Sequence, residues 1–332
     1  MNKTVKQRKQ FDFQKFSSRY SLLLILIVFM AISSLLNETF LTTRNLINVV
    51  RQQSVFIIIA LGQMMLIISG MLDLSAGAVI AFAGCLSINV YKATGNMGLA
   101  ILVAILVSVI ANGLSGVMVT VFKTPAFIAT LAMQTIARGA ALKVTGGQNI
   151  YEVGDYGRLG QGDLWGIPYP AMIMIAISII MLIVMKYTRF GRSTYAVGGN
   201  IDAARASGIN VNSVQLRAFL LHGILVGIAA VIYMSRVNSG IPNGAQGYEF
   251  DALTATVIGG TSFTGGVGNV GNTIIGAFLV GFMNNIMNIL SIDSYVQQMI
   301  RGVIIAGAVI WDINAKDKGG KTKLLKRIKT NS

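Results

Sequence analysis

The chain has 332 residues, a formal net charge of +15, 54% hydrophobic residues and only 12% charged residues. About a quarter of the residues in a soluble globular domain are charged, so this composition excludes a soluble globular domain. Thirteen of the 27 basic residues lie in two tails that flank the apolar sequence, which argues against a nucleic-acid-binding face. The single cysteine, Cys85, allows no disulfide and no Cys-based metal site, and no metal ligands are predicted.

Apolar runs of about 17–25 residues recur along the chain, each long enough to cross a hydrocarbon layer of about 30 Å. The runs are continuous rather than alternating, which predicts helices rather than barrel strands. The predicted fold is an all-α, polytopic membrane helical bundle of about ten transmembrane helices, or eight or nine if a weak span is re-entrant. We place the spans near residues 20–36, 46–69, 74–91, 98–121, 125–142, 169–186, 213–235, 250–264, 268–290 and 295–312.

The distribution of Lys and Arg predicts the orientation of the bundle. The tails at 1–19 and 313–332 are basic, so both termini are expected in the cytoplasm, on either side of a transmembrane domain at 20–312. The loop at 187–212 is mostly basic and is expected inside, whereas the loop at 143–168 is mostly acidic and is expected outside. The first span follows basic residues without a cleavage site, and we interpret it as an uncleaved signal anchor.

Isolated ionisable residues within the spans have local explanations. Asp73 either caps a helix that begins at the next residue, or is a functional or paired carboxylate at membrane depth. Glu249 and Asp251 are predicted first-turn acids at the outer side of the eighth span. The lone His222 is expected to hydrogen-bond to a neighbouring helix, and Arg138 is expected to snorkel outward.

Glycine and proline predict helix openings and turns. Thr124-Pro125 is expected to open a helix, with Thr as N-cap and Pro at the first helical position. Two Gly-interrupted stretches, 69–77 and 259–266, lie in different halves, and whether they mark an internal duplication is left open. The residues assigned to structural or gating turns are Asp73, Ser75, Gly77, Glu249, Asp251, Gly260, Gly265 and Gly266.

Amide and hydroxyl side chains gather on two spans. Asn284, Asn285 and Asn288 share one broad helical face, and Thr130 and Gln134 form a similar face on the fifth span. Such groups can line a path for sugar hydroxyls, because amides both donate and accept. They can equally bond one helix to another, and both alternatives are kept.

The chain shows no sign of an ATP site or an active site of its own. Gly320-Lys321-Thr322 looks like the end of a phosphate-binding loop, but Ala315 stands where the pattern needs its first glycine. No Ser–His–Asp or Cys–His set is evident, so we predict neither an enzyme nor a bound cofactor.

Several ordered stretches resemble a known family. Asp73-Leu74-Ser75-Ala76-Gly77 resembles the D-L-S-x-G stretch of the ribose, xylose and galactose permeases of ATP-binding cassette importers. Residues 188–192, 196–200 and 203–209 are similar to the long cytoplasmic loop of that family, and 248–252 and 259–268 to its later signature. Residues 275–285 look like the ribose branch, and the likeness runs from about residue 20 to 312.

The resemblance implies a permease subunit in the bacterial cytoplasmic (inner) membrane, forming the path for a monosaccharide, ribose or a similar pentose or hexose. It implies an external sugar-binding protein, a second permease copy, and an ATPase subunit with two nucleotide-binding domains that binds ATP and Mg²⁺. The cytoplasmic loop at 187–212 would couple to that ATPase. The coupling residues it implies are Arg192, Gly199, Asn200, Ala203, Ala204, Arg205, Ser207 and Gly208.

Three alternatives remain at this point. A secondary transporter should carry ion ligands or an acid at membrane depth, for which Asp73 is a weak candidate. A related permease for branched-chain amino acids or nucleosides would differ in its external binding protein. A membrane enzyme or scaffold would not co-purify with an ATPase.

Overall fold

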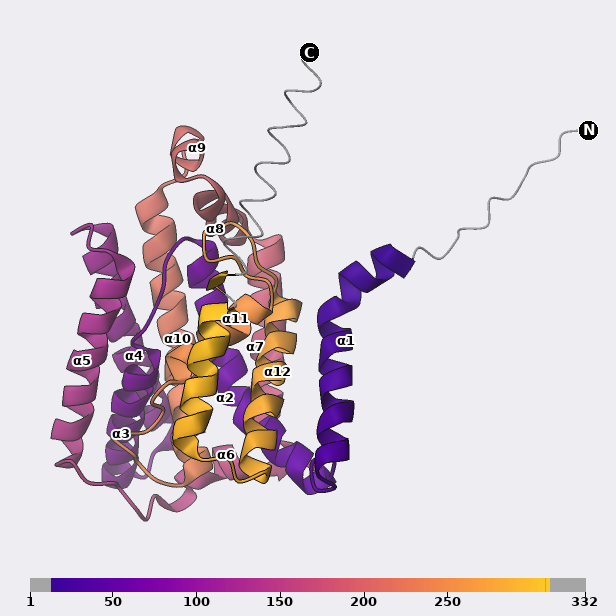
Figure 1. The fold of residues 1–332 in the computed structure, drawn as a ribbon. Coiled ribbons are helices and arrows are strands. Elements are labelled where there is room, and N and C mark those ends of the chain that lie inside the picture. The colour runs from indigo at the N-terminus through magenta and orange to yellow at the C-terminus, as the bar shows by residue number, and fades with distance from the viewer. Residues whose placement is uncertain (1–12, 308, 311–332) are drawn as a thin grey trace, which may run out of the picture.

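The computed structural model describes residues 13–307, 309 and 310, most of which are helical (Figure 1). In chain order the elements are α1 (Phe13–Leu36), α2 (Thr43–Ile68), α3 (Ala76–Thr94), α4 (Met97–Thr120), α5 (Ala126–Thr145), η1 (Gly154–Gly157), α6 (Arg158–Gln161), β1 (Asp163–Leu164), β2 (Ile167–Pro168), α7 (Tyr169–Tyr187), α8 (Arg189–Gly199), α9 (Ile201–Ala206), α10 (Val211–Val237), α11 (Tyr248–Ile258) and α12 (Val270–Ile289). Residues 294–307 form a further helical segment. The predicted tail at 313–332, with Gly320-Lys321-Thr322, and residues 1–12 of the first tail lie outside the described residues.

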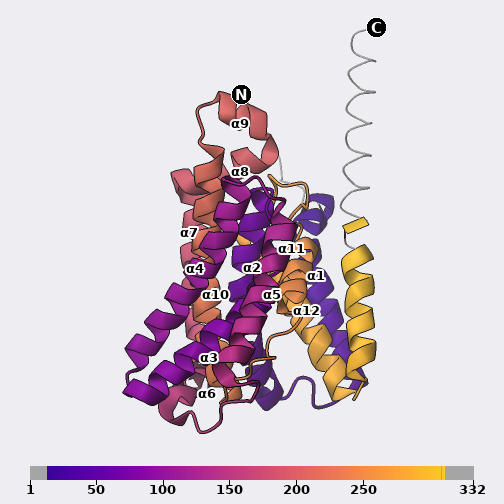
Figure 2. The same ribbon diagram turned by 90° about the vertical axis from the view of Figure 1, so that its left-hand side faces the viewer.

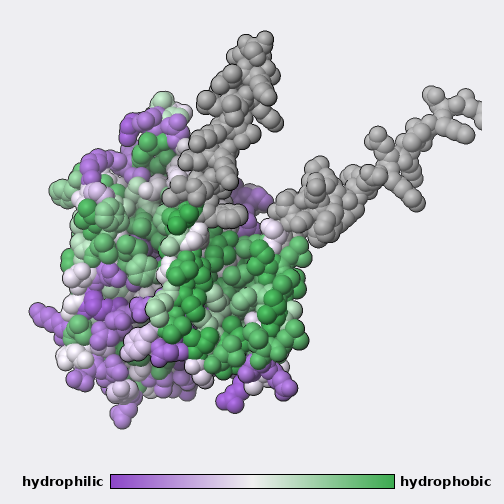
Figure 3. Space-filling model, in the orientation of Figure 1, coloured by the Kyte–Doolittle hydropathy of each residue, from purple (hydrophilic) through white to green (hydrophobic). Residues whose placement is uncertain are grey.

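The chain is an all-α membrane protein. Six described helices are long and apolar enough to cross a membrane, namely α2, α3, α4, α7, α10 and α12, and α1 contains a shorter apolar stretch, Ser21–Leu36. Figure 3 shows an apolar surface on the side where α1 and α12 lie, with polar residues concentrated at the top, around α8 and α9, and along the lower edge.

Two predicted helix starts and one end are wrong. Pro125 itself occupies the cap position of α5, so Thr124 does not cap that helix. α3 begins at Ala76, behind Ser75, rather than directly after Asp73. α11 ends at Ile258 instead of continuing to residue 264.

The early end of α11 has a local cause. Gly260 adopts φ +79°, a left-handed conformation that glycine takes without steric cost and that stops a helix. α11 therefore has only 11 residues and a length of about 16 Å, half of a hydrocarbon layer.

Asparagine and threonine open most of the other helices. Asn210 caps α10 and Asn269 caps α12, each through a side-chain oxygen that accepts the backbone N–H three residues on. Thr42, Asn96, Thr188 and Asn200 do the same for α2, α4, α8 and α9. These caps satisfy backbone donors at helix starts within or near an apolar environment.

The core is built around α2 and α10. Every residue of α2 from Gln53 to Ile68 is buried, and α2 packs against α7, α10, α11 and α12. α10 packs most extensively against α4 and also against α3, which in turn contacts α5. α1 lies at the edge of the bundle beside α12 (Figure 1). β1 and β2 form a short antiparallel pair in the loop between α5 and α7.

Candidate functional site

The first Gly-interrupted stretch turns back into the bundle after α2. Gln215, near the start of α10, donates to the carbonyl of Ser69 at 3.5 Å, and His222 lies 3.0 Å from Asp73. Seven residues of α10 separate these contacts, a rise of about 10 Å. The segment 69–75 therefore runs alongside α10 from its first turn toward its middle, and α3 begins there.

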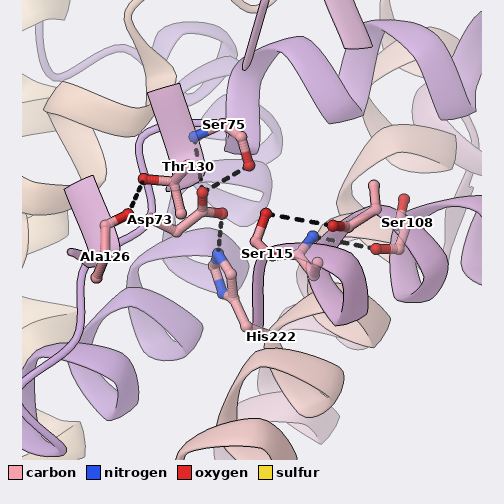
Figure 4. Close-up of polar contacts among 9 residues, drawn as sticks. Asp73, Ser75, Ser108, Ser115, Ala126, Thr130 and His222 are labelled. Atoms are coloured by element: carbon pink, nitrogen blue, oxygen red, sulfur yellow. Dashed lines mark hydrogen bonds and ion pairs between the residues drawn. The ribbon is translucent and has the colours of Figure 1, made fainter. Parts of the chain in front are cut away.

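The carboxylate of Asp73 is fully buried and paired on both oxygens. Oδ1 accepts the backbone N–H of Ser75 at 2.7 Å and its hydroxyl at 2.6 Å, and Oδ2 lies 3.0 Å from Nε2 of His222 (Figure 4). Asp73 is thus a paired buried carboxylate, and its proposed role as the cap of the next residue's helix is wrong because that helix starts later. Its pairing accounts for its presence in apolar surroundings.

His222 is hydrogen-bonded, but its partner Asp73 lies in the non-helical segment before α3 and not, as its isolation predicted, in a neighbouring helix. His222 is fully buried on α10 and bonds to the segment before α3. A Cβ on Gly62 of α2 would overlap the imidazole ring, so glycine at that position makes the space that His222 occupies. Three elements therefore meet around one buried acid–imidazole pair.

A different segment, 238–247, enters from the other end of the bundle, between α10 and α11. Arg138 of α5 donates to the carbonyls of Pro242 at 2.7 Å and Gly244 at 2.9 Å. The expectation that Arg138 snorkels is wrong, because its guanidinium points inward and holds this segment. The N–H of Ala245 donates to the hydroxyl of Tyr233 at 3.1 Å, which fixes the segment to α10 just before α11 begins.

The segments 69–75 and 238–247 lead to two helix starts, those of α3 and α11, that meet inside the bundle. A Cβ on Gly77, in the first turn of α3, would overlap the carbonyl oxygen of Ala245 and the carboxylate of Glu249, in the first turn of α11. Two helices therefore start beside each other within the bundle, and each carries a positive partial charge at that end. Buried acids of the chain itself, Asp73 and Glu249, lie next to these ends.

The acids of α11 reach in two directions. Glu249 accepts from Nε2 of Gln134 on α5 at 3.2 Å, and Asp251 lies 3.4 Å from the guanidinium of Arg301 in the helical segment 294–307. Both acids are first-turn residues, as predicted. Because Gln134 lies near the middle of α5, however, they sit inside the bundle and not at its outer side.

Two cavities lie on either side of the start of α11, and Gln246 lines both. One, of about 580 Å³, is lined with Gln134, Thr135, Arg138 and Glu249 between α5 and α11. The other, of about 590 Å³, lies between α11 and the segment 294–307, where Gln298 and Arg301 supply polar groups. Figure 2 shows α5 and the segment 294–307 on either side of α11. We call the surface that carries both cavities the α5–α11 face.

The predicted polar residues fall into separate places. Asn285 exchanges two hydrogen bonds of 2.9 Å with Asn45 of α2, and Asn288 accepts from Gln297 at 2.9 Å. Asn284 is buried next to Asp251. Thr130 is buried and donates to the carbonyl of Ala126 within α5. Of these residues and Gln134, only Gln134 lines either of the two cavities.

Glycines form a junction at the end of the bundle where α8 lies. A Cβ on Gly198 would overlap the carbonyl oxygen of Ile68, the last residue of α2. That carbonyl accepts the N–H of Gly266 at 2.9 Å, and Gly265 and Gly266 pack on Gly198 and Gly199. The end of α2, the end of α8 and the loop after α11 are therefore in backbone contact. We call this contact the glycine junction.

The predicted coupling residues lie mostly on α9 and its flanks, which project from the bundle (Figure 1). Asn200 caps α9 by accepting the N–H of Ala203 at 2.9 Å, and Gly208 closes it with φ +80°. Ala204 is buried in a small apolar cluster with Val197 and two valines of α10. The cluster fixes α9 to the bundle.

The polar coupling residues are more exposed. Arg205 pairs with Asp202 at 3.4 Å on the outside of α9, and Ser207 donates to the carbonyl of Ala203 at 2.9 Å. Arg192 lies apart from them at the base of α8, where its guanidinium donates to the carbonyl of Tyr187 at 3.2 Å.

Several residues of this arrangement were missed from the sequence. Arg138, Thr135 and Gln246 line a cavity, and Gly198 and Gly62 make room for close contacts with other elements. One signal was available, because Thr130, Gln134 and Arg138 follow one another at i, i+4 and i+8 and mark a polar stripe on α5. The glycines gave no such signal, since their neighbours are distant in sequence.

The family model and the similar proteins that were found are all described as permease components of transport systems. Residues 45–309 match the family model described as branched-chain amino acid transport system / permease component. The ribose import permease protein RbsC of Haemophilus influenzae is 37% identical over 92% of this chain and 96% of its own length. The D-allose permease protein AlsC and the L-arabinose permease protein AraH of Escherichia coli are each 32% identical, over 92% and 95% of this chain and 95% and 96% of their own lengths. No solved structure gives a significant match.

Proposed function

Because the chain belongs to the family of branched-chain amino acid transport system permease components, we propose that it is the membrane-spanning subunit of an ATP-binding cassette importer for a monosaccharide. The named relatives that resemble it over nearly their full length are permeases for ribose, allose and arabinose. It is a transport subunit and not an enzyme.

The proposal includes ten membrane crossings and two cytoplasmic termini in the bacterial inner membrane. α3 and α11 each complete a crossing together with the non-helical segment that precedes them, 69–75 and 238–247. With α1, α2, α4, α5, α7, α10, α12 and the segment 294–307, these make ten. The basic loop at 187–212, which carries α8 and α9, then lies on the cytoplasmic side with tails 1–19 and 313–332, as the positive-inside rule favours.

The observation that carries the function is the α5–α11 face. Its cavities expose amide, hydroxyl, guanidinium and carboxylate groups at the depth where α3 and α11 begin. Polar groups facing hydrocarbon cost several kcal/mol each, so this face needs a cover that can accept hydrogen bonds. A second copy of the permease, packed face to face, would enclose a polar path, and the homodimer is part of the proposal.

The charges at the broken helices favour a neutral solute. In transporters whose half-helix ends point at an anionic substrate, the positive ends are free to bind it. Here Asp73 and Glu249 already lie beside the starts of α3 and α11. An uncharged sugar fits this arrangement better than the carboxylate of an amino acid. The branched-chain amino acids named in the family description remain the second candidate substrate class.

Energy would come from a partner ATPase with two nucleotide-binding domains, which would bind ATP and Mg²⁺ itself. α9 and its flanks, from Gly199 to Gly208, are the surface we assign to that partner, because α9 is exposed and projects beyond the bundle. An external binding protein would deliver the sugar and supply most of the selectivity.

Uptake by proteoliposomes that contain the permease, its ATPase and the binding protein tests the proposal. We expect ATP-dependent uptake of labelled ribose or another monosaccharide and none of leucine. Uptake of leucine in preference to every sugar would support the second substrate class. Uptake driven by a proton or sodium gradient, without the ATPase, would overturn the importer.

A further inference from the structure

A separate groove at the base of α8 has no part in the proposed sugar path. It encloses about 340 Å³ between α7, α8 and the start of α12, and its lining includes Leu182, Lys186, Arg192, Tyr195 and Asn269. Tyr195 shapes one wall, because its hydroxyl donates to the carbonyl of Gly268 at 2.9 Å. Burial raises the pKa of Tyr195, so this hydroxyl stays protonated.

The groove is positively charged. Lys186 and Arg192 are both exposed, and the three helices that form the walls, α7, α8 and α12, contain no Asp or Glu. Both basic side chains are therefore without an acidic partner on the elements that surround them. A ligand for this groove should carry negative charge.

An apolar strip leads along α7 to these charges. Ile179, Leu182 and Ile183 are 54%, 42% and 48% exposed, and they lie three to seven residues before Lys186, on the same side of the helix. The Lys186 ammonium lies 5.3 Å from the ring centroid of Tyr187, which is itself exposed at the end of the helix. An apolar helix face that ends in aromatic and basic residues marks the boundary between hydrocarbon and headgroups.

We propose that this groove binds the headgroup of an anionic phospholipid of the cytoplasmic leaflet. Lys186 and Arg192 contact its phosphate, and its acyl chains follow the exposed face of α7. A free anion would use the charges but would leave the strip of Ile179, Leu182 and Ile183 without a role. Basic grooves between membrane helices on the cytoplasmic side bind anionic headgroups in this way.

Native mass spectrometry of the full-length chain in detergent tests this site, with titration of phosphatidylglycerol and, in parallel, phosphatidylcholine of the same acyl chains. We expect preferential binding of phosphatidylglycerol. Lys186→Gln and Arg192→Gln should each weaken it about fivefold, and the double variant about 25-fold, as expected for basic residues near an anionic surface. The matched control Arg205→Gln, which removes an exposed arginine of α9, should leave binding of both lipids unchanged.

Four results would overturn the site. Phosphatidylglycerol binding could be unchanged in the double variant, or binding of both lipids could fall equally. Inorganic phosphate at millimolar concentration could displace the lipid from the native chain, which would indicate a free-anion site. Arg192→Gln could weaken co-purification of the ATPase without affecting lipid binding, which would place Arg192 in the coupling surface.

Discussion

Substitution of Gly198 by alanine should separate ATP hydrolysis from transport. The added methyl group would overlap the carbonyl oxygen of Ile68 and approach the backbone N of Gly266, and neither is the end of a flexible side chain. The hydrogen bond between those two groups, now 2.9 Å, would have to open. Overpacking costs about 1–3 kcal/mol and a lost hydrogen bond about 1 kcal/mol, so we expect a total of about 2–4 kcal/mol.

Thermal unfolding in detergent and reconstituted uptake measure the two consequences. A loss of this size should lower the unfolding temperature by roughly 3–6 °C. The glycine junction joins α8 to the end of α2 and to the loop after α11. Uptake by the reconstituted complex should therefore fall by a larger factor than its rate of ATP hydrolysis. Equal loss of ATP hydrolysis and uptake would refute the coupling part of the reasoning.

Two alanine variants serve as controls. Gly199→Ala, one residue further along α8, places its methyl group where no atom lies within 4 Å and should leave the unfolding temperature unchanged. Gly307→Ala also meets no atom within 4 Å and serves as the control for uptake. If Gly199→Ala destabilises the chain as much as Gly198→Ala, close packing at the junction is not the cause.

Three further predictions concern polar side chains. His222→Leu leaves Asp73 without its imidazole partner and should destabilise the chain by about 3–5 kcal/mol. Asp73→Asn in the same chain should restore most of this loss. A double-mutant cycle of unfolding free energies that shows no coupling would contradict the pairing. Asn285→Ala removes both bonds to Asn45 and should cost about 1–2 kcal/mol while preserving uptake, whereas lost uptake at unchanged stability would place Asn285 in the path. Gln246→Ala removes an exposed side chain that lines both cavities, so sugar uptake should fall about two- to tenfold with the unfolding temperature unchanged; normal uptake kinetics would locate the path elsewhere.

The sequence predicted what depends on local pattern. Apolar runs located the membrane helices, and the glycines at 259 and 260 were recognised as an interruption, although the end of α11 was placed six residues too late. Helix ends at glycine are hard to locate within an apolar run, because hydropathy stays high on both sides of the break. The start of α3 was misplaced for a related reason, since Asp73 and Ser75 are both good caps and only the backbone shows which one is used.

Partners across the bundle could not be predicted in this way. Asp73 and His222 are 149 residues apart, and Asn45 and Asn285 are 240 apart. A single chain gives no pattern that links such positions. Arg138 is an example, because a cation one turn from the predicted end of its span suggests snorkelling, whereas the structure places the carbonyls of Pro242 and Gly244 beside it.

The glycine junction is connected to both broken segments through very few residues. From Ile68 the chain passes through 69–75 to Asp73 and α3, and from Gly265 it passes back over a short turn to the end of α11. The starts of these two helices meet at Gly77 and Glu249, next to the cavities of the α5–α11 face. A displacement of α8 would therefore move two helices, α3 and α11, that touch at the proposed path. Packed backbones transmit such shifts without compression, because protein interiors are close-packed. A partner bound at α9 could therefore act on the path through these short connections. No rigid element that spans the whole membrane is needed.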